Sequence, residues 1–152
     1  MTNVRRLSRL TAAGLAVAAG AAGWLIAGTG QASAATAAPP CGVTARACVD
    51  LATQQAWLMD NGAVTYGPVQ VRTGRASAPT DPGVFHVTYR DRDHVSSVYH
   101  VAMPYSVFFN GGDAFHEGSL AESSHGCVHL TRTSAETFYA NLSPGDEVDV
   151  VN

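Results

Sequence analysis

Lysine is absent from the 152-residue chain, and all nine basic residues are arginine. Mechanisms that depend on a lysine side chain are therefore excluded, among them P-loop phosphate binding and Schiff-base catalysis. Charged residues of both signs are also scarce, at 14% of the chain against about 25% in average proteins, which excludes a highly charged disordered protein. The formal net charge of −3 offers no positive excess for phosphates, so we expect no nucleic-acid partner.

The first 34 residues differ from the rest of the chain. Three arginines precede an uncharged apolar run over residues 10–28, and an Ala-Ser-Ala triplet follows at 32–34. This order predicts a secretory signal peptide over 1–34, an exported product, and membrane contact through that segment only. An uncleaved membrane anchor is the alternative, because the apolar run approaches the ~20 residues that span a bilayer.

The chain from residue 35 onward holds six arginines and twelve acidic residues, a net charge of −6. We expect residues 35–46 to be a linker with a disulfide-bearing N-terminal segment, and 47–152 to be one catalytic domain. In an oxidising compartment, three cysteines leave one thiol unpaired. The short separation of Cys41 and Cys48 favours a disulfide between them, with Cys127 free. Nothing in the sequence indicates an oligomer, so we expect a monomer.

Short segments rich in β-branched and aromatic residues, separated by turn residues, predict a mostly β fold. The expected strands cover residues 47–51, 55–59, 64–73, 84–89, 95–103 and 106–109, with a last strand around Val148 and Val150. Asn61-Gly62 predicts a tight hairpin turn. Gly67-Pro68 predicts a bulge or edge position, and residues 91–93 predict a polar turn.

One segment has the pattern of a helix. Thr133 and Glu136 have the spacing of a capping box, apolar residues follow at spacings of three and four, and Pro144-Gly145 predicts its end. We therefore expect a single helix packed against the β domain, with no internal repeat and no second domain.

Cys127 has three histidines close to it in the sequence, His116, His125 and His129. One interpretation is a cysteine nucleophile with a histidine base, because a paired imidazole lowers the thiol pKa. Another is a metal site, because Cys and His are the preferred zinc ligands. Gly126 favours a turn whose backbone N–H groups can face a developing oxyanion. Since the two paired ligand elements of a structural zinc site are missing, the pattern favours a thiol enzyme over a metal site, with an inert structural cluster as the third interpretation.

The segment 124–127, Ser-His-Gly-Cys, with His116 upstream, resembles the signature of the L,D-transpeptidase catalytic domain, the YkuD-like family. Similar motifs occur in the family's order over roughly residues 48–151. They are Val49-Asp50-Leu51, Gln54, Trp57-Leu58, Gly62, Val71-Arg72-Thr73-Gly74, Pro79-Thr80-Asp81-Pro82-Gly83-Val84-Phe85, Met103-Pro104-Tyr105 and Gly145-Asp146. The resemblance implies a β-sandwich-like domain with one packed helix in its C-terminal half, acting in the cell wall without a cofactor.

The resemblance also implies a reaction. Cys127 attacks the carbonyl of the third residue, a diamino acid, of a peptidoglycan stem peptide, and the terminal D-residue leaves a thioester behind. An amine of a second stem peptide then forms a 3→3 cross-link, whereas attack by water gives carboxypeptidase activity. His116 is implied as the base, with its ring oriented by the backbone carbonyl of Glu117.

Further roles around the nucleophile follow from the same resemblance. The backbone N–H groups of His125, Gly126 and Cys127 are expected to form the oxyanion hole, with Tyr105 as a further contributor. Ser124 is expected to hold the loop by hydrogen bonding.

Two positions depart from the family's pattern. His129 stands where Arg or Asn is usual, at a position that supports the substrate end, and Asp81 stands where Pro is common. His129 and Arg132 are both candidate substrate-binding residues, and an exposed salt bridge is the alternative role of Arg132. The alternatives to a transpeptidase are a catalytically weak wall-binding or regulatory domain of the same fold, and a zinc-dependent peptidoglycan hydrolase; no metal ligand is assigned.

Overall fold

The computed structural model describes residues 38–152, so the expected signal peptide lies outside the described residues. Within that range the chain forms nine strands and one helix. In chain order they are β1 (Ala47–Asp50), β2 (Gln55–Asp60), β3 (Ala63–Gln70), β4 (Gly83–His86), β5 (Tyr89–Val95), β6 (Ala102–Asn110), β7 (Asp113–Glu117), β8 (Val128–Leu130), α1 (Arg132–Asn141) and β9 (Glu147–Val151). Between residues 38 and 152, no helix is long and apolar enough to cross a membrane.

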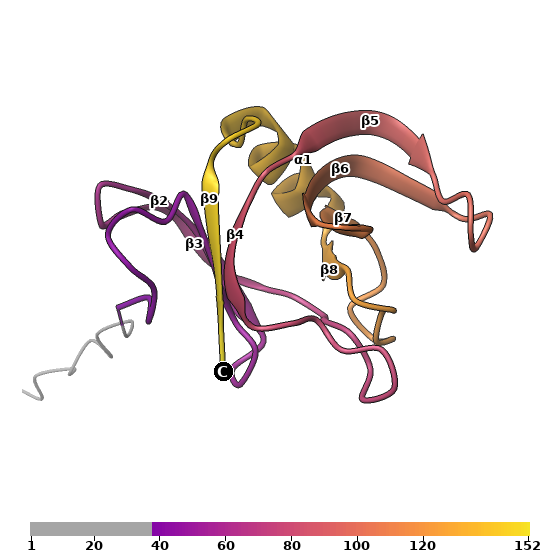
Figure 1. The fold of residues 1–152 in the computed structure, drawn as a ribbon, viewed down its shortest axis with the longest axis horizontal. Coiled ribbons are helices and arrows are strands. Elements are labelled where there is room, and N and C mark those ends of the chain that lie inside the picture. The colour runs from indigo at the N-terminus through magenta and orange to yellow at the C-terminus, as the bar shows by residue number, and fades with distance from the viewer. Residues whose placement is uncertain (1–37) are drawn as a thin grey trace, which may run out of the picture. The chain divides into compact units, whose positions relative to one another are not determined.

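The strands form two sheets with α1 packed against them (Figure 1). One sheet has the order β3-β2-β1-β9-β4, in which β1 and β9 are parallel neighbours. The other has the order β5-β6-β7-β8, in which β7 and β8 are parallel. Both sheets and the buried face of α1 contribute to one apolar core, centred on Phe115 and Phe138. The predicted class, mostly β with one packed helix, is confirmed.

Two local predictions at the N-terminal end of the domain are confirmed. Asn61 and Gly62 both have positive φ angles in the turn between β2 and β3, as a two-residue type I′ turn requires. Cys41 and Cys48 form a disulfide, and Cys127 is a free cysteine. The segment before β1 packs against the domain, since Ala45 is fully buried in a cluster with Cys48 and Trp57.

The predicted polar turn at residues 91–93 is wrong, because these residues lie inside β5. Asp91 pairs with Ser106 and Asp93 pairs with Pro104 across the ladder to β6. Strand β5 is an edge of its sheet and most of its side chains are exposed, so charged residues are tolerated there and reduce edge-to-edge association.

The boundaries of the neighbouring strands also differ from the prediction. The expected strand 84–89 divides at Val87, where the chain passes from the first sheet to the second. The expected strand 95–103 instead contains the hairpin turn between β5 and β6, in which His100 has a φ of 55°. Strand β6 then runs without a break through the residues expected to separate two strands. Strand β7, which carries His116, was not predicted.

The helix begins two residues earlier than the capping-box spacing predicts. Thr131 is the N-cap, and its hydroxyl accepts a hydrogen bond from the Ser134 N–H at 3.3 Å. Thr133 therefore lies within the first turn, and Glu136 pairs with Arg132 at 3.2 Å rather than closing a capping box. Several Thr and Ser residues in this stretch are able to cap a helix. The helix ends at Asn141, before Pro144-Gly145, as expected.

Candidate functional site

A cavity of about 900 Å³ is lined by one face of the β5-β6-β7-β8 sheet. It brings together five of the predicted residues, which are Cys127, His116, Ser124, His125 and His129. The β5–β6 hairpin forms one wall, with Tyr89, Tyr99 and Phe108 among its lining side chains, and the segment from Glu117 to His125 forms another. Figure 1 shows this hairpin extending well past β7.

Register across two parallel strands places the histidines of the site. His116 in β7 is directly opposite His129 in β8, and their rings meet edge to face with centroids 4.9 Å apart. Because β8 begins at the residue after Cys127, the same pairing brings the nucleophile candidate beside β7. The loop that connects the two strands carries the Ser-His-Gly-Cys motif.

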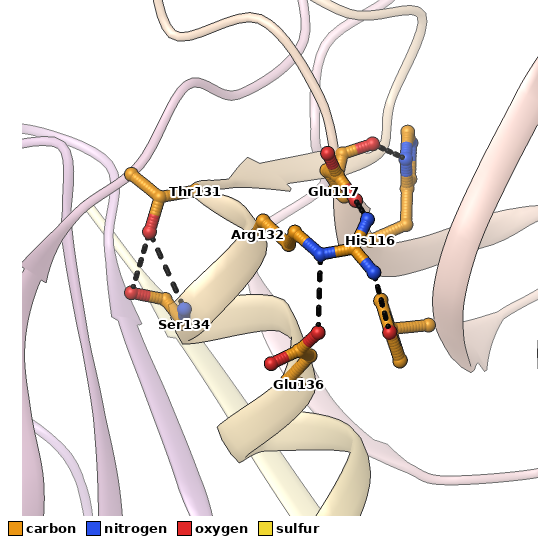
Figure 2. Close-up of polar contacts among 7 residues, drawn as sticks. His116, Glu117, Thr131, Arg132, Ser134 and Glu136 are labelled. Carbon is orange, nitrogen blue, oxygen red and sulfur yellow. Dashed lines mark hydrogen bonds and ion pairs between the residues drawn. The ribbon is translucent and has the colours of Figure 1, made fainter.

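His116 is buried and is held in one tautomer. Its Nδ1 lies 2.7 Å from the Glu117 carbonyl oxygen (Figure 2). Since a carbonyl can only accept, Nδ1 carries the hydrogen and Nε2 has a free lone pair. Burial is the main reason that the pKa of His116 is lowered to about 4; the Glu117 carbonyl opposes this shift, and His129 and His94 add to it. His116 is therefore a neutral imidazole at neutral pH.

Cys127 is a partly buried thiol. It packs against a small apolar cluster of Met103, Phe108 and Ala114, and its Sγ lies 3.7 Å from the Gly112 carbonyl oxygen. Burial raises the pKa of Cys127 to about 11, and Asp113 adds to this, while a hydrogen bond from the Ala114 backbone opposes it. The resting pair consequently consists of a neutral thiol and a neutral imidazole, which requires proton transfer during the attack.

The turn at 124–127 is fixed by two hydroxyl groups. The Ser124 hydroxyl donates to the Cys127 carbonyl at 2.5 Å and accepts from the Gly126 N–H at 3.2 Å. The Thr80 hydroxyl donates to the Gly126 carbonyl at 2.6 Å and accepts from the Gly74 N–H at 2.9 Å. The Gly126 N–H is therefore already engaged. Within residues 38–152 we find no hydrogen-bond partner for the N–H groups of His125 and Cys127.

Gly126 is the residue that this turn requires. Its φ of +120° is rarely adopted by residues with a side chain. A Cβ placed on Gly126 comes within 2.1 Å of the Asp113 carboxylate, so the side chain of Asp113 fills the space that the missing Cβ leaves. Gly126 itself does not line the cavity, and its contribution to the site is through its backbone.

His129 is held from two sides. Its Nδ1–H donates to the Ser119 carbonyl at 2.9 Å, which ties β8 to the loop after β7. A Cβ on Gly118 comes within 2.6 Å of the His129 ring, so the absence of a side chain at Gly118 lets this loop approach the ring. His129 thus braces both the His116 ring and the loop that lines the cavity.

Tyr105 and Arg132 do not line the cavity. Tyr105 belongs to the main core and contacts Tyr139 of α1, so its ring lies on the helix side of the sheet. Arg132 donates to the Tyr105 hydroxyl at 3.0 Å and pairs with Glu117 at 3.5 Å and with Glu136 at 3.2 Å (Figure 2). Arg132 therefore contacts Glu117, the residue whose carbonyl orients His116. It forms salt bridges, which was the alternative role expected for it, and does not line the cavity.

Sequence reasoning missed several residues of the site. Tyr99, in the β5–β6 turn, packs against the exposed His125 in a tilted arrangement with ring centroids 4.4 Å apart. His94 lies edge to face against Phe108 and lines the cavity. Thr80 and Asp113 reach the Gly126 turn from distant segments. The Pro-Thr pair at 79–80 belongs to one of the family's motifs, but its contact with residue 126 depends on tertiary folding.

Replacing Thr80 with valine keeps the shape of the side chain and removes its hydroxyl. The buried Gly126 carbonyl and Gly74 N–H then lose their partner, so we expect a loss of about 1–3 kcal/mol in the free energy of unfolding and slower modification of Cys127. Denaturant unfolding and thiol alkylation rates measure these two effects. Thr65→Val, on an exposed position of β3, is the matched control; an equal loss in both variants contradicts the assignment.

Within the described residues, 38–152, no group of three or more His, Cys, Asp or Glu side chains is arranged to hold a metal ion.

Comparison with known proteins gives a consistent result. A family model described as the L,D-transpeptidase catalytic domain (YkuD) matches residues 44–150. A solved L,D-transpeptidase from Stackebrandtia nassauensis is 34% identical, with a TM-score of 0.67, over 70% of this chain and 54% of that chain. A search of curated protein sequences finds no match.

Two more distant structures share the fold. An L,D-transpeptidase from Mycobacterium tuberculosis H37Rv is 24% identical, with a TM-score of 0.63, over 68% of this chain and 56% of that chain. L,D-transpeptidase 3 from Mycobacterium tuberculosis, solved with a faropenem-derived adduct, is 22% identical, with a TM-score of 0.63, over 68% of this chain and 58% of that chain. The chain thus spans little more than half the length of these relatives.

Proposed function

The chain belongs to the family of L,D-transpeptidase catalytic domains, and from this premise we propose that it is an exported cysteine transpeptidase that forms 3→3 cross-links in peptidoglycan. The observation that carries the proposal is the state of His116. Its Nδ1–H is bound to the Glu117 carbonyl, its Nε2 is free, and it shares one cavity with the Cys127 thiol. A base with a fixed tautomer that lines the same cavity as a free thiol suits acyl transfer.

In the first step, His116 Nε2 takes the proton of Cys127 as the sulfur attacks the carbonyl of the third stem residue. The sequence suggested three oxyanion donors, but the Gly126 N–H is engaged by Ser124. We therefore assign the oxyanion hole to the N–H groups of His125 and Cys127. The Ser124 hydroxyl holds the Gly126 N–H and the Thr80 hydroxyl holds the Gly126 carbonyl, which lie between these two donors, so the hole needs little rearrangement before the reaction.

The proton that His116 takes from Cys127 is used again when the D-residue leaves. His116 returns it to the amine of the departing D-residue, which leaves a thioester on Cys127. An acceptor amine then attacks the thioester carbon, the carbon–sulfur bond breaks, and the thiol is restored. Attack by water at the same carbon gives the carboxypeptidase product.

The supporting residues contribute through His116. We propose that His129 limits rotation of the His116 ring through their edge-to-face contact, and lines the substrate end of the cavity. Arg132 and Tyr105 act behind the sheet by holding Glu117, so they are positioning residues here rather than contacts to substrate.

Export is part of the proposal. The signal peptide predicted for residues 1–34 lies outside the described residues, and the disulfide between Cys41 and Cys48 supports an oxidising compartment. The intact mass of the exported protein tests the cleavage. The mass of a chain that begins at Ala35 agrees with cleavage, and a mass that includes residues 1–34 contradicts it.

The proposed activity is tested by incubating the purified protein with disaccharide-tetrapeptides and analysing the products by mass spectrometry. We expect a cross-linked dimer, release of the terminal D-residue, and no effect of a chelator. Hydrolysis that a chelator abolishes indicates the zinc-dependent alternative. A protein that binds the tetrapeptide but neither cross-links nor hydrolyses it indicates a regulatory domain.

A further inference from the structure

Asp113 presents a carboxylate to the cavity beside the nucleophile turn. It is the first residue of β7 and lines the same cavity as Cys127 and His116. Its Oδ1 occupies the space in which a Cβ on Gly126 cannot fit. The carboxylate is therefore held against the residue that precedes the nucleophile, on the side of the turn that faces the β6–β7 hairpin.

This carboxylate has no positive partner of its own. Among the described residues, 38–152, the ion pairs involve Arg46, His94 and Arg132, and none of them reaches Asp113. Its hydrogen bond from the Asn110 side-chain amide is long, at 3.4 Å. The chain also contains no lysine whose ammonium group can approach the cavity.

The environment of Asp113 is unfavourable for an isolated charge. Its side chain is half-buried, and burial together with the nearby Asp81 raises the pKa of the Asp113 carboxyl. A partly desolvated carboxylate gains from a cationic partner more than an exposed one does. A cationic ligand that enters the cavity relieves this cost.

We propose that Asp113 receives the amino group of the acceptor stem peptide and so determines that the acyl group passes to an amine rather than to water. This inference rests on the proposed transpeptidase function and adds a specificity-determining residue to it. Two other acids line the cavity, but Glu117 is already paired with Arg132, and Glu122 lies in the loop before the motif.

The transfer brings positive charge into the cavity that Asp113 and Cys127 line. The acceptor arrives as an ammonium ion that the carboxylate attracts, and it loses one proton to solvent before it reacts. As its nitrogen attacks the thioester carbon, positive charge develops on that nitrogen, which Asp113 stabilises. The carbon–nitrogen bond forms, the carbon–sulfur bond breaks, and the second proton passes through His116 to the Cys127 sulfur, restoring the thiol.

The test compares two products of one acyl-enzyme. Wild type and Asp113→Asn are each given a tetrapeptide donor with increasing concentrations of an acceptor amine, and the cross-linked and hydrolysed products are quantified. Asp113→Asn keeps the size of the side chain, so we expect formation of the acyl-enzyme at the wild-type rate or faster. The ratio of aminolysis to hydrolysis is expected to fall at least about tenfold, with a higher KM for the acceptor.

Controls separate the possible causes. Asp93→Asn removes the same charge from an exposed carboxylate that does not line the cavity, and its product ratio is expected to match wild type. An unchanged ratio in Asp113→Asn overturns the proposal, as does loss of the acyl-enzyme in that variant, since either result assigns Asp113 a structural role. Absence of an acyl-enzyme in the wild type contradicts the proposed function instead.

Discussion

Replacing Cys127 with alanine is expected to abolish both the acyl-enzyme and the cross-linked product. In the proposed mechanism the sulfur is the atom that bonds to the substrate, and no other side chain in the cavity is a thiol. Loss of a covalent nucleophile costs about 10⁴-fold or more in kcat where it has been removed from other enzymes. Product formation by mass spectrometry and the rate of D-residue release measure the loss.

The folded state is expected to survive this substitution. Cys127 packs against Met103 and Phe108 but forms no disulfide, so Cys127→Ala keeps the Cys41–Cys48 bridge and the sheet intact. Substrate binding to the variant, measured by calorimetry, is the control for correct folding. Turnover in Cys127→Ala at more than about one hundredth of the wild-type rate is incompatible with covalent catalysis through the sulfur.

Substitution of His116 with glutamine is expected to lower the rate of acylation by about 10²–10⁴-fold, the usual contribution of a general base. Glutamine retains polarity at this buried position but cannot accept the thiol proton and return it. The single-turnover rate of acyl-enzyme formation measures the effect. A variant that acylates within about threefold of the wild type excludes His116 as the base.

The dependence of this rate on pH gives a sharper result. Because the pKa of His116 is lowered to about 4 and that of Cys127 is raised to about 11, the imidazole is neutral and the thiol is protonated at every pH between these values. The wild-type rate should fall as His116 becomes protonated near pH 4 and stay level from about pH 5 to 10. His116→Gln should lose the acid limb and depend on thiolate formation near pH 11.

Thiolate absorbance distinguishes this neutral pair from an ion pair formed before substrate binds. A preformed thiolate and imidazolium produce ultraviolet thiolate absorbance at neutral pH, and the same level region in the rate profile. The neutral pair predicts no such absorbance until the pH approaches the pKa of Cys127, about 11. Strong thiolate absorbance at pH 7 in the wild type, lost in His116→Gln, contradicts the neutral pair.

Local patterns predicted the parts of the fold that local interactions determine. Asn61-Gly62 predicted a turn because few other pairs adopt two positive φ angles, and the spacing of Cys41 and Cys48 suggested their disulfide. The edge strand β5 was not predicted, because Asp91 and Asp93 resemble turn residues unless the strand is known to lie at an edge. The helix start was displaced, because the choice between Thr131 and Thr133 depends on tertiary packing.

In the candidate site, too, local sequence predicts some features and tertiary contacts determine the others. Ser124 to Cys127 are contiguous, and their motif together with His116 is enough to predict four residues that line the cavity, namely His116, Ser124, His125 and Cys127. The features that sequence patterns do not predict depend on contacts between distant segments or on the detailed geometry of the turn. The Ser124 hydroxyl engages the Gly126 N–H, and Tyr105 faces the helix side of its sheet.

Chemistry that depends on an unpaired charge is the hardest to predict from sequence. Nothing in the sequence around Asp113 distinguishes it from Asp91 or Asp93. Only its place in the cavity, against Gly126 and without a cation, sets it apart. Its carboxylate lines the cavity in which we expect the acceptor to bind.

The central claim is that catalysis proceeds through a thioester on Cys127. The most direct test is the intact-mass spectrum of the wild-type protein mixed with a tetrapeptide donor and quenched in acid, followed by peptide mapping. We predict that the mass rises by that of the acyl donor less its terminal D-residue, and that the added mass lies on the peptide containing Cys127. Turnover without such an adduct, or with an adduct on another residue, contradicts this claim.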